Sequence, residues 1–453
     1  SNTEKQGTIT IDLAGNKEYA SGIVNESTGK IEITGAITIT GKGVYSNIIS
    51  NKGKITATDT KLISNGTYVN GQTGIRLISN TGVLNLNNTT IKHISGRYTY
   101  GIYNETGTVN INGLTTQEGG RAIDTYEGEV NITGTVTREG IGTLIYLAQK
   151  SSASEGTKLN IENATIVDNQ TTSQMMYGDK GKIKIYNSNI KAKTSVLGIG
   201  TNGVGVDITI EKSKITSSNN TVISQYKGNT EIKDSDIIYN GTYSYGSIQF
   251  RSTGNLTITG ESNITSTGEK AIDGDSAGTI TIGEKIGEGK TEEPQTTPII
   301  KGTKYGIYQN NTNGKLYFYD GTVVGSNSYQ AIYGKITDME AGYDVITKED
   351  TEAKTLTATL DRLPVAQIGE NQYYSLYDAM QAVEGTEETT ITLLRDFNIT
   401  TTGQSAQIEE GKNVVIDLNG YNVISTLENT IINKGNLKIT DNNTEKQGTM
   451  TIN

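Results

Sequence analysis

Residues able to carry acid–base or nucleophilic chemistry are scarce in this sequence. Cysteine is absent, and the one histidine, His93, lies in Thr90-Ile-Lys-His-Ile94 without an adjacent carboxylate. A Ser-His-Asp triad or a zinc site would depend on that single histidine, so we expect neither. A polar residue on a strand face is the simpler interpretation of His93.

Paired acidic residues are the next candidates for chemistry. Two tight pairs, Asp234/Asp236 and Asp273/Asp275, stand in the repetitive part of the chain. Oxygens of the second pair would suit Ca²⁺, but neither pair fits an EF-hand loop or a nonapeptide calcium repeat. A solvated turn is the interpretation we favour there. The sequence therefore predicts no catalytic, cofactor or metal site and no enzyme.

Tyrosine offers a different kind of surface chemistry, since an exposed aromatic ring can stack on a sugar ring. Single exposed tyrosines are also ordinary on strands, and that reading is favoured here. The tyrosines that recur near one predicted strand of the repeat described below are nevertheless the candidate glycan-stacking residues of this chain: Tyr103, Tyr126, Tyr146, Tyr177 and Tyr226.

Composition limits the architecture that could position these residues. Of 453 residues only 33% are hydrophobic, and there are 54 glycines but 3 prolines. The apolar residues are mostly Ile, Val and Leu in short alternating runs, which indicates a thin core repeated many times. The net charge is −10 without a basic stripe, so we expect no nucleic-acid partner. No apolar run approaches the roughly 20 residues of a membrane span.

A repeated phrase organises most of the chain. A glycine is followed by alternating polar and apolar residues, as in Gly29-Lys-Ile-Glu-Ile33 and Gly53-Lys-Ile-Thr-Ala57, whose glycines lie 24 residues apart. Two further strand-like pieces fall in each period of about 24 residues. Three short strands per coil predict an all-β fold, a right-handed parallel β-helix. An antiparallel β-sandwich is the alternative, but it needs no fixed period.

The alternation assigns inward and outward faces to each strand. Ile111 and Ile132 are expected to stack inward in neighbouring coils. The outward column contains four consecutive asparagines, for which a ladder of stacked amides is expected: Asn85, Asn110, Asn131 and Asn160.

The phrases Asn80-Thr-Gly-Val-Leu-Asn-Leu86, Asn104-Glu-Thr-Gly-Thr-Val-Asn-Ile111 and Tyr100-Gly-Ile-Tyr-Asn104 resemble the pectin-lyase-like β-helix superfamily. They are most similar to the large adhesin-like cell-surface repeat proteins of Firmicutes. The resemblance covers most of residues 1–340. It implies the fold but no activity, because lyases, hydrolases, tailspikes and inert stalks share that fold.

The chain is expected to divide into a β-helix body at 1–340, an irregular segment or closing strands at 341–364, and a helix-capped start of a further module at 365–453. Ser375, with Asp378 three residues on, can cap a short amphipathic helix. Its apolar face would hold Leu376, Ala379, Met380 and Val383. The resembling modules open with such a helix, which covers the exposed end of the β-helix.

The two ends of the chain repeat one another. Thr3-Glu-Lys-Gln-Gly-Thr-Ile-Thr-Ile11 returns as Thr444-Glu-Lys-Gln-Gly-Thr-Met-Thr-Ile452, offset by 441 residues. We therefore expect one turn of a larger tandem repeat, a structural stalk or fibre module of an extracellular bacterial surface protein. Its partners would be further copies of the module and host or cell-surface glycans. The alternative is a glycan-binding or glycan-cleaving β-helix.

Overall fold

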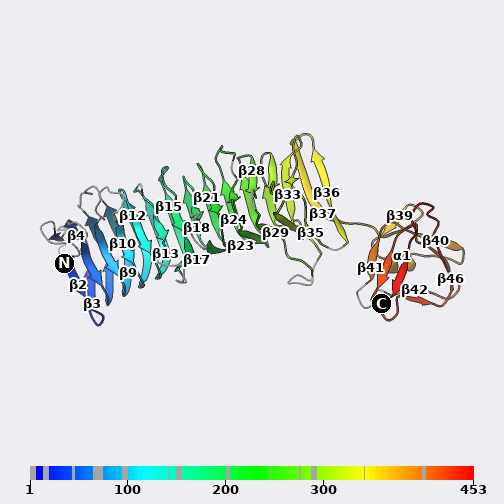
Figure 1. Cartoon of the computed structure of the whole chain (residues 1–453), viewed down its shortest axis with the longest axis horizontal. Helices are drawn as coiled ribbons and strands as arrows, with labels where there is room; N and C mark the ends of the chain where they lie inside the picture. Colours follow the sequence, from blue (N-terminus) through cyan, green and yellow to red (C-terminus); the bar gives the residue numbers. More distant parts are fainter. Residues whose placement is uncertain are drawn as a thin grey trace. The chain divides into compact units, whose positions relative to one another are not determined.

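The computed structural model describes residues 7–13, 20–42, 46–64, 75–93, 100–140, 142–148, 156–199, 205–244, 246–274, 277–286, 293–340, 342–399 and 405–452. The chain forms two compact units, a body of residues 1–339 and 346–359, and a C-terminal unit of residues 340–345 and 360–453. Both are built from short, stacked strands, and the one helix of the described residues is short (Figure 1).

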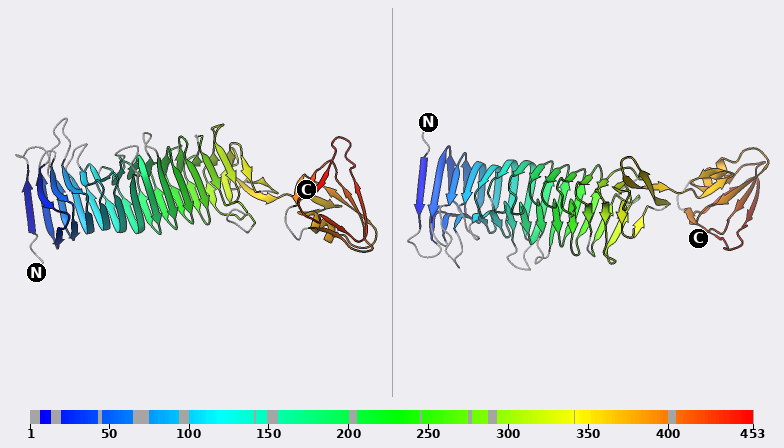
Figure 2. Two further views of the ribbon diagram at one scale, coloured as in Figure 1. Left: turned by 60° about the horizontal axis from the view of Figure 1, so that its bottom comes forward. Right: turned by 90° about the horizontal axis from the view of Figure 1, so that it is seen from above.

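The body is a solenoid of parallel strands stacked in three ladders. Figure 2 shows the stacked strands from two sides. The first ladder is a separate sheet of 13 strands: β2 (Ser21–Asn25), β5 (Asn47–Asn51), β8 (Arg76–Asn80), β10 (Tyr100–Asn104), β12 (Arg121–Thr125), β14 (Ile145–Leu147), β16 (Met176–Gly178), β19 (Leu197–Ile199), β22 (Ile223–Gln225), β25 (Ile248–Phe250), β28 (Lys270–Asp273), β31 (Tyr305–Tyr308) and β34 (Ile332–Tyr333).

The other two ladders belong to one bent sheet. The second ladder contains β3 (Lys30–Thr34), β6 (Lys54–Thr58), β9 (Val83–His93), β11 (Thr108–Gln117), β13 (Glu129–Arg138), β15 (Thr157–Asp168), β17 (Lys180–Tyr186), β20 (Gly205–Glu211), β23 (Asn229–Lys233), β26 (Asn255–Thr259), β29 (Thr279–Ile282), β32 (Lys315–Phe318) and β35 (Asp338–Met339).

The third ladder begins at β1 and passes through the second halves of the long strands β9 to β15. Its separate strands are β1 (Gly7–Asp12), β4 (Ile37–Lys42), β7 (Lys61–Ser64), β18 (Asn189–Ala192), β21 (Lys214–Ser217), β24 (Asp236–Tyr239), β27 (Asn263–Ser266), β30 (Ile299–Lys301) and β33 (Thr322–Ser326). β36 (Tyr343–Asp350) follows, and β37 (Thr355–Arg362) pairs with β33 in the antiparallel sense.

Columns of aliphatic residues fill the interior between the ladders. Ile111 pairs with Ile132 in the next coil, and both are about 1% exposed, which confirms the predicted inward stacking. Because each strand alternates, one set of side chains meets the same set above and below. The predicted class, an all-β solenoid of parallel stacked coils with one short helix, is therefore confirmed. Its right-handed sense stays a prediction.

The C-terminal unit has its own three ladders and its own core. Its strands are β38 (Ala366–Ile368), β39 (Asn371–Tyr373), β40 (Glu388–Leu393), β41 (Phe397–Ile399), β42 (Ala406–Ile408), β43 (Asn413–Asp417), β44 (Val423–Ser425), β45 (Ile431–Asn433), β46 (Asn436–Thr440) and β47 (Met450–Ile452). The parallel ladders are β40–β43–β46, β41–β44–β47 and β42–β45.

The helix α1 (Leu376–Gln381) begins where the sequence predicts. The Ser375 hydroxyl accepts a hydrogen bond from the Asp378 amide at 2.9 Å and donates one to the Asp378 carboxylate at 2.6 Å. These bonds satisfy a helix-end donor that would otherwise face solvent. The face made by Leu376, Ala379, Met380 and Val383 is buried in the core of the C-terminal unit.

Candidate functional site

Four of the five predicted tyrosines lie together on the outward face of the first ladder. Tyr103 in β10, Tyr146 in β14 and Tyr177 in β16 occupy one outward column, in which Asp124 of β12 separates the first two. Tyr126 follows β12, and its ring centroid lies 5.1 Å from that of Tyr103. The rings of Tyr146 and Tyr177 stack at 5.3 Å with 3° between their planes. All four are partly exposed.

Tyr226 lies apart from this group. It follows β22, two strands beyond β16 in the same sheet. Its hydroxyl oxygen accepts a hydrogen bond of 3.0 Å from Arg251, whose guanidinium also stands 5.6 Å from the ring centre. The predicted row of five tyrosines is therefore a group of four rings and one separate ring.

Two arginines complete the group of four rings, and sequence inspection did not single them out. The guanidinium of Arg76 lies 3.5 Å from the ring centre of Tyr103, and that of Arg121 lies 3.6 Å from Tyr146. A cation over an aromatic face is attracted by the negative potential of that face, and this contact holds the ring in one orientation. The ring of Tyr100 lies 6.0 Å from that of Tyr103. We call the rings, the two arginines and Asp124 the tyrosine face: Arg76, Tyr100, Tyr103, Arg121, Asp124, Tyr126, Tyr146 and Tyr177.

Asp124 is the unusual member of the tyrosine face, because its side chain is fully buried beneath its neighbours. Burial raises the pKa of this carboxyl to about 6, although the positive charges of Arg121 and Arg76 oppose the rise. One oxygen lies 3.3 Å from an Arg121 nitrogen. Within the described part of the chain, the other oxygen accepts no hydrogen bond.

The same combination of residues occurs a second time, near the other end of the first ladder. Lys270 and Asp273 of β28 form an ion pair of 3.1 Å, as Arg121 and Asp124 of β12 do. β28 lies beside β31, and Lys270 stands 3.9 Å from the Tyr308 ring centre. The signal was present in the sequence: each [Arg/Lys]-Ala-Ile-Asp strand is next to a Tyr-Gly-Ile-Tyr strand.

The groups on these surfaces are of kinds that can contact a sugar. Partly exposed rings flanked by cations can stack on an apolar sugar face while polar groups contact its hydroxyls. A general acid must reach the substrate oxygen within hydrogen-bond distance, and the Asp124 side chain has no exposed surface. Burial also raises the pKa of the Tyr126 and Tyr146 hydroxyls, so both rings are neutral in ordinary buffers.

The other residues weighed for chemistry are dispersed. Asp236 contacts Lys214 at 3.9 Å and accepts a hydrogen bond from Asn263 at 3.0 Å. Asp275 and the side chain of His93 lie outside the described residues. Across the described ranges, no three acidic or histidine side chains converge as metal ligands do, and no helix is long and apolar enough to cross a membrane.

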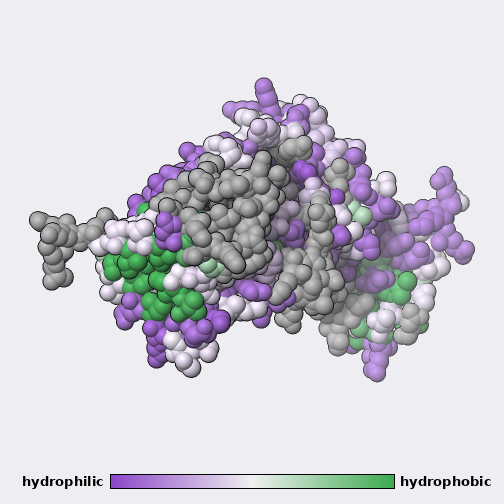
Figure 3. Space-filling model, turned by 60° about the vertical axis from the view of Figure 1, so that its left-hand side comes forward, coloured by the Kyte–Doolittle hydropathy of each residue, from purple (hydrophilic) through white to green (hydrophobic). Residues whose placement is uncertain are grey.

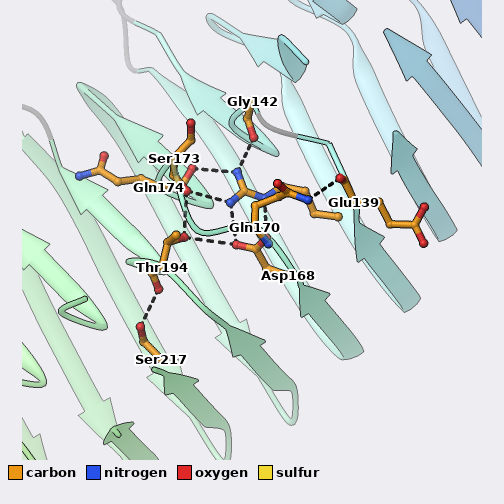
Figure 4. A network of polar contacts seen from close by, with 9 residues as sticks. Glu139, Gly142, Asp168, Gln170, Ser173, Gln174, Thr194 and Ser217 are labelled. Atoms are coloured by element: carbon orange, nitrogen blue, oxygen red, sulfur yellow. Dashed lines mark hydrogen bonds and ion pairs between the residues drawn. The ribbon is translucent and has the colours of Figure 1, made fainter. Parts of the chain in front are cut away.

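A buried ion pair that sequence inspection missed holds the turns leading into β14 and β16 (Figure 4). Nε and one Nη of Arg138 donate to the two Asp168 carboxylate oxygens, each at 2.7 Å. The remaining donors reach the carbonyl oxygens of Gly142, Ser173 and Gln174. All five N–H groups are therefore satisfied, as a guanidinium that is 1% exposed requires. This arrangement is an anchor for the fold.

The predicted amide ladder on the outward face of the second ladder is confirmed. Asn110 donates to Asn85 at 2.9 Å, Asn131 to Asn110 at 2.9 Å and Asn160 to Asn131 at 2.8 Å. Each side-chain amide thus links its own coil to the coil before it. Such bonds stabilise the stacking of the coils.

Apolar residues are exposed on the first coil of the body and on the last coil of the C-terminal unit. At the N-terminal end Ile9 is 45% exposed and Val24 is 51% exposed, and Figure 3 shows a patch of apolar side chains on that end. In the C-terminal unit Ile439 and Ile452 are 47% and 59% exposed. An open ladder edge over apolar residues is a template for further strand pairing.

No family model, no characterised protein and no solved structure matches this chain.

Proposed function

We propose that this chain is a non-enzymatic structural module of a tandem-repeat protein. In this proposal the modules form an adhesin-like stalk or fibre on the outside of a bacterial cell, and each module's nearest partners are further copies of itself. The resemblance of the coil phrases to surface repeat proteins supports the setting. The structure is compatible with a structural or a binding role.

The observation that carries this proposal is the place of the repeated strand. The phrase at 7–11 forms β1, the first strand of the third ladder, and the matching phrase at 448–452 contains β47, the last strand of β41–β44–β47. One strand thus opens a ladder in the body and closes a ladder in the C-terminal unit. A tandem repeat requires this arrangement, because β47 of one copy would serve as β1 of the next.

The order of the neighbouring strands agrees with a shared strand. In the body, β3, β4 and β5 belong to the second, third and first ladders in turn. In the C-terminal unit, β43, β44 and β45 follow the same cycle. If β47 of one copy serves as β1 of the next copy, β46 would pair with β3 of that next copy, and β45 would pair with its β2. All three open edges would then be paired, which removes exposed sheet edges.

Hydrogen exchange on a two-copy protein tests the proposal. Residues 1–452 followed by residues 12–453 make two copies that share one strand. We expect the amides of β45 and β46 in the first copy, and of β2 and β3 in the second, to exchange at least about tenfold more slowly than in the single chain. The open β2 and β3 of the first copy serve as the internal control. Equal exchange at both places would contradict the proposal.

Glycan binding by the tyrosine face is the second candidate, and the stacked pair Tyr146/Tyr177 is the observation that favours it. The stacked rings cover one face of each other, and Arg121 lies over the other face of Tyr146, so a sugar would meet the outer face of Tyr177 and the edges of both rings. Cleavage is the weaker part of this alternative, because Asp124 is buried and the partly exposed carboxylate beside the group, Asp179, already accepts a hydrogen bond of 2.7 Å from the Tyr146 hydroxyl.

Affinity electrophoresis through gels that contain soluble polysaccharides tests this binding. We expect retardation of the native chain, and a roughly tenfold weaker interaction after Tyr146→Ala or Tyr177→Ala, the effect of about 1.4 kcal/mol of stacking. Tyr374→Ala, which removes a 46% exposed ring of the C-terminal unit, is the matched control. Retardation that is absent from every gel, or unchanged in both variants, would rule out the tyrosine face.

A further inference from the structure

A second, buried amide ladder runs through the first coils of the body. The Nδ2 of Asn25 donates to Asn51 Oδ1 at 2.8 Å, Asn51 to Asn80 at 2.7 Å, and Asn80 to Asn104 at 2.8 Å. All four side chains are at most 4% exposed. Each amide donates forward along the solenoid. In the described part of the chain, the oxygen of the first member, Asn25, therefore has no amide donating to it.

Asn433 occupies the equivalent place at the end of the C-terminal unit. It ends β45 and stands two residues before a glycine, in Asn433-Lys-Gly435, as Asn51 does in Asn51-Lys-Gly53. Its side-chain oxygen accepts the Gly435 amide at 3.1 Å, the position is exposed, and no further coil of this chain follows it in the ladder. Within the described residues its Nδ2 donates no hydrogen bond, so this group could donate to an acceptor in a following coil.

Glycines fix the register between successive coils of the second ladder. The Lys54 amide donates to the Gly29 carbonyl at 3.0 Å, and the Val83 amide donates to the Gly53 carbonyl at 2.8 Å. A Cβ at Gly53 would collide with the Gly29 carbonyl oxygen, so these positions must remain glycine. Gly435 precedes β46 as Gly29 precedes β3. Stacking Gly435 on Gly29 brings Leu437 beside Ile31.

We propose that the end of one copy splices onto the start of the next in this register, with Asn433 donating its amide to Asn25 and Lys438 lying directly beside Glu32. The inference rests on the proposed tandem function and adds the residue pairs that join the copies. Lys438 and Glu32 are exposed, outward and opposite in charge. An exposed ion pair adds little stability. It distinguishes this register from neighbouring ones, because a two-residue slip would separate the charges.

Disulfide trapping tests the register, because the chain contains no cysteine of its own. In the two-copy protein, Lys438→Cys in the first copy is combined with Glu32→Cys in the second. Residues opposite one another on adjacent strands lie about 5 Å apart, within the range of a disulfide. We expect near-complete cross-linking under mild oxidation, read by mass spectrometry of the linked peptides.

The matched control combines Lys438→Cys with Thr34→Cys, which is also exposed and lies two residues further along the same face. That shift adds roughly 6.6 Å along the strand and takes the pair beyond disulfide reach. Cross-linking at Thr34 in preference to Glu32 would overturn the register. Absence of both cross-links would also overturn it, while slowed exchange at the β45 and β46 edges would still uphold the tandem function. Failure of that exchange test would reject the tandem function itself.

Discussion

The buried carboxylate of Asp124 lowers the stability of the folded chain by an amount that depends on pH. Its pKa in the folded chain is about 6, mainly because the carboxyl is buried, whereas an unfolded aspartate titrates near 3.8. A raised pKa means that the folded state favours the protonated acid. Protonation of Asp124 therefore adds to the free energy of unfolding. This contribution is complete below about pH 4 and is lost as the pH rises through about 6. The difference corresponds to roughly 3 kcal/mol above pH 7.

We therefore predict that Asp124→Asn removes most of the fall in thermal stability between about pH 4 and about pH 6. At pH 8 the melting temperature of the variant should equal or exceed that of the native chain. Loss of the ion pair with Arg121 makes this gain smaller. Differential scanning calorimetry across this pH range measures the effect, with the exposed Asp344→Asn as control. An unchanged pH profile in Asp124→Asn would show that the carboxyl does not titrate as described.

At the scale of the element, the features that could be predicted are those encoded within one strand or one helical turn. The alternation of Val109, Ile111 and their equivalents fixes the inward face. The outward asparagine ladder follows because an asparagine recurs once per coil, between the two inward apolar residues of the strand, as in Val109-Asn110-Ile111. The helix α1 follows from a cap and a 3.6-residue pattern around Ser375. Each of these signals is local and repeats.

Features that depend on the turns between strands were missed for a physical reason. Arg138 and Asp168 are 30 residues apart, and the other acceptors of Arg138 are backbone carbonyls, which carry no signature in the side-chain pattern. The buried amide ladder had a signal, an asparagine two or three residues before the strand glycine, as at Asn51 and Asn104. That signal looks like an ordinary turn until stacking brings the amides together.

The tyrosine face shows the same limit. Spacing along the chain brought out Tyr103 and Tyr146, but the register between coils decides which rings touch. Tyr226 follows β22, two strands beyond Tyr177, and the places after Tyr177 in the outward column are held by Gly198 and Ser224. The burial of Asp124 depends on the rings and guanidinium groups of neighbouring coils, so composition alone could not show its raised pKa.

At the scale of the whole molecule, the two units have separate cores and separate sheets. The sheets of five, three and two strands in the C-terminal unit are distinct from the 24-stranded and 13-stranded sheets of the body. In a solenoid each coil is stabilised by its neighbours in the ladder, so cooperativity spreads along continuous ladders. Two sets of ladders should therefore unfold as two cooperative blocks.

We predict two thermal transitions for the single chain, each sensitive to its own core. Ile132 is about 1% exposed in the body and Ile416 is fully buried in the C-terminal unit. An aspartate at either place buries an unpaired charge and should cost roughly 3–5 kcal/mol. Ile132→Asp should lower the transition of the body alone, and Ile416→Asp that of the C-terminal unit alone. Calorimetry separates the two, with Ile132→Val and Ile416→Val as mild controls. One shared transition that moves with both substitutions would mean that the two units unfold as a single cooperative unit. The C-terminal unit could not then fold independently and pair with the first coil of the copy that follows.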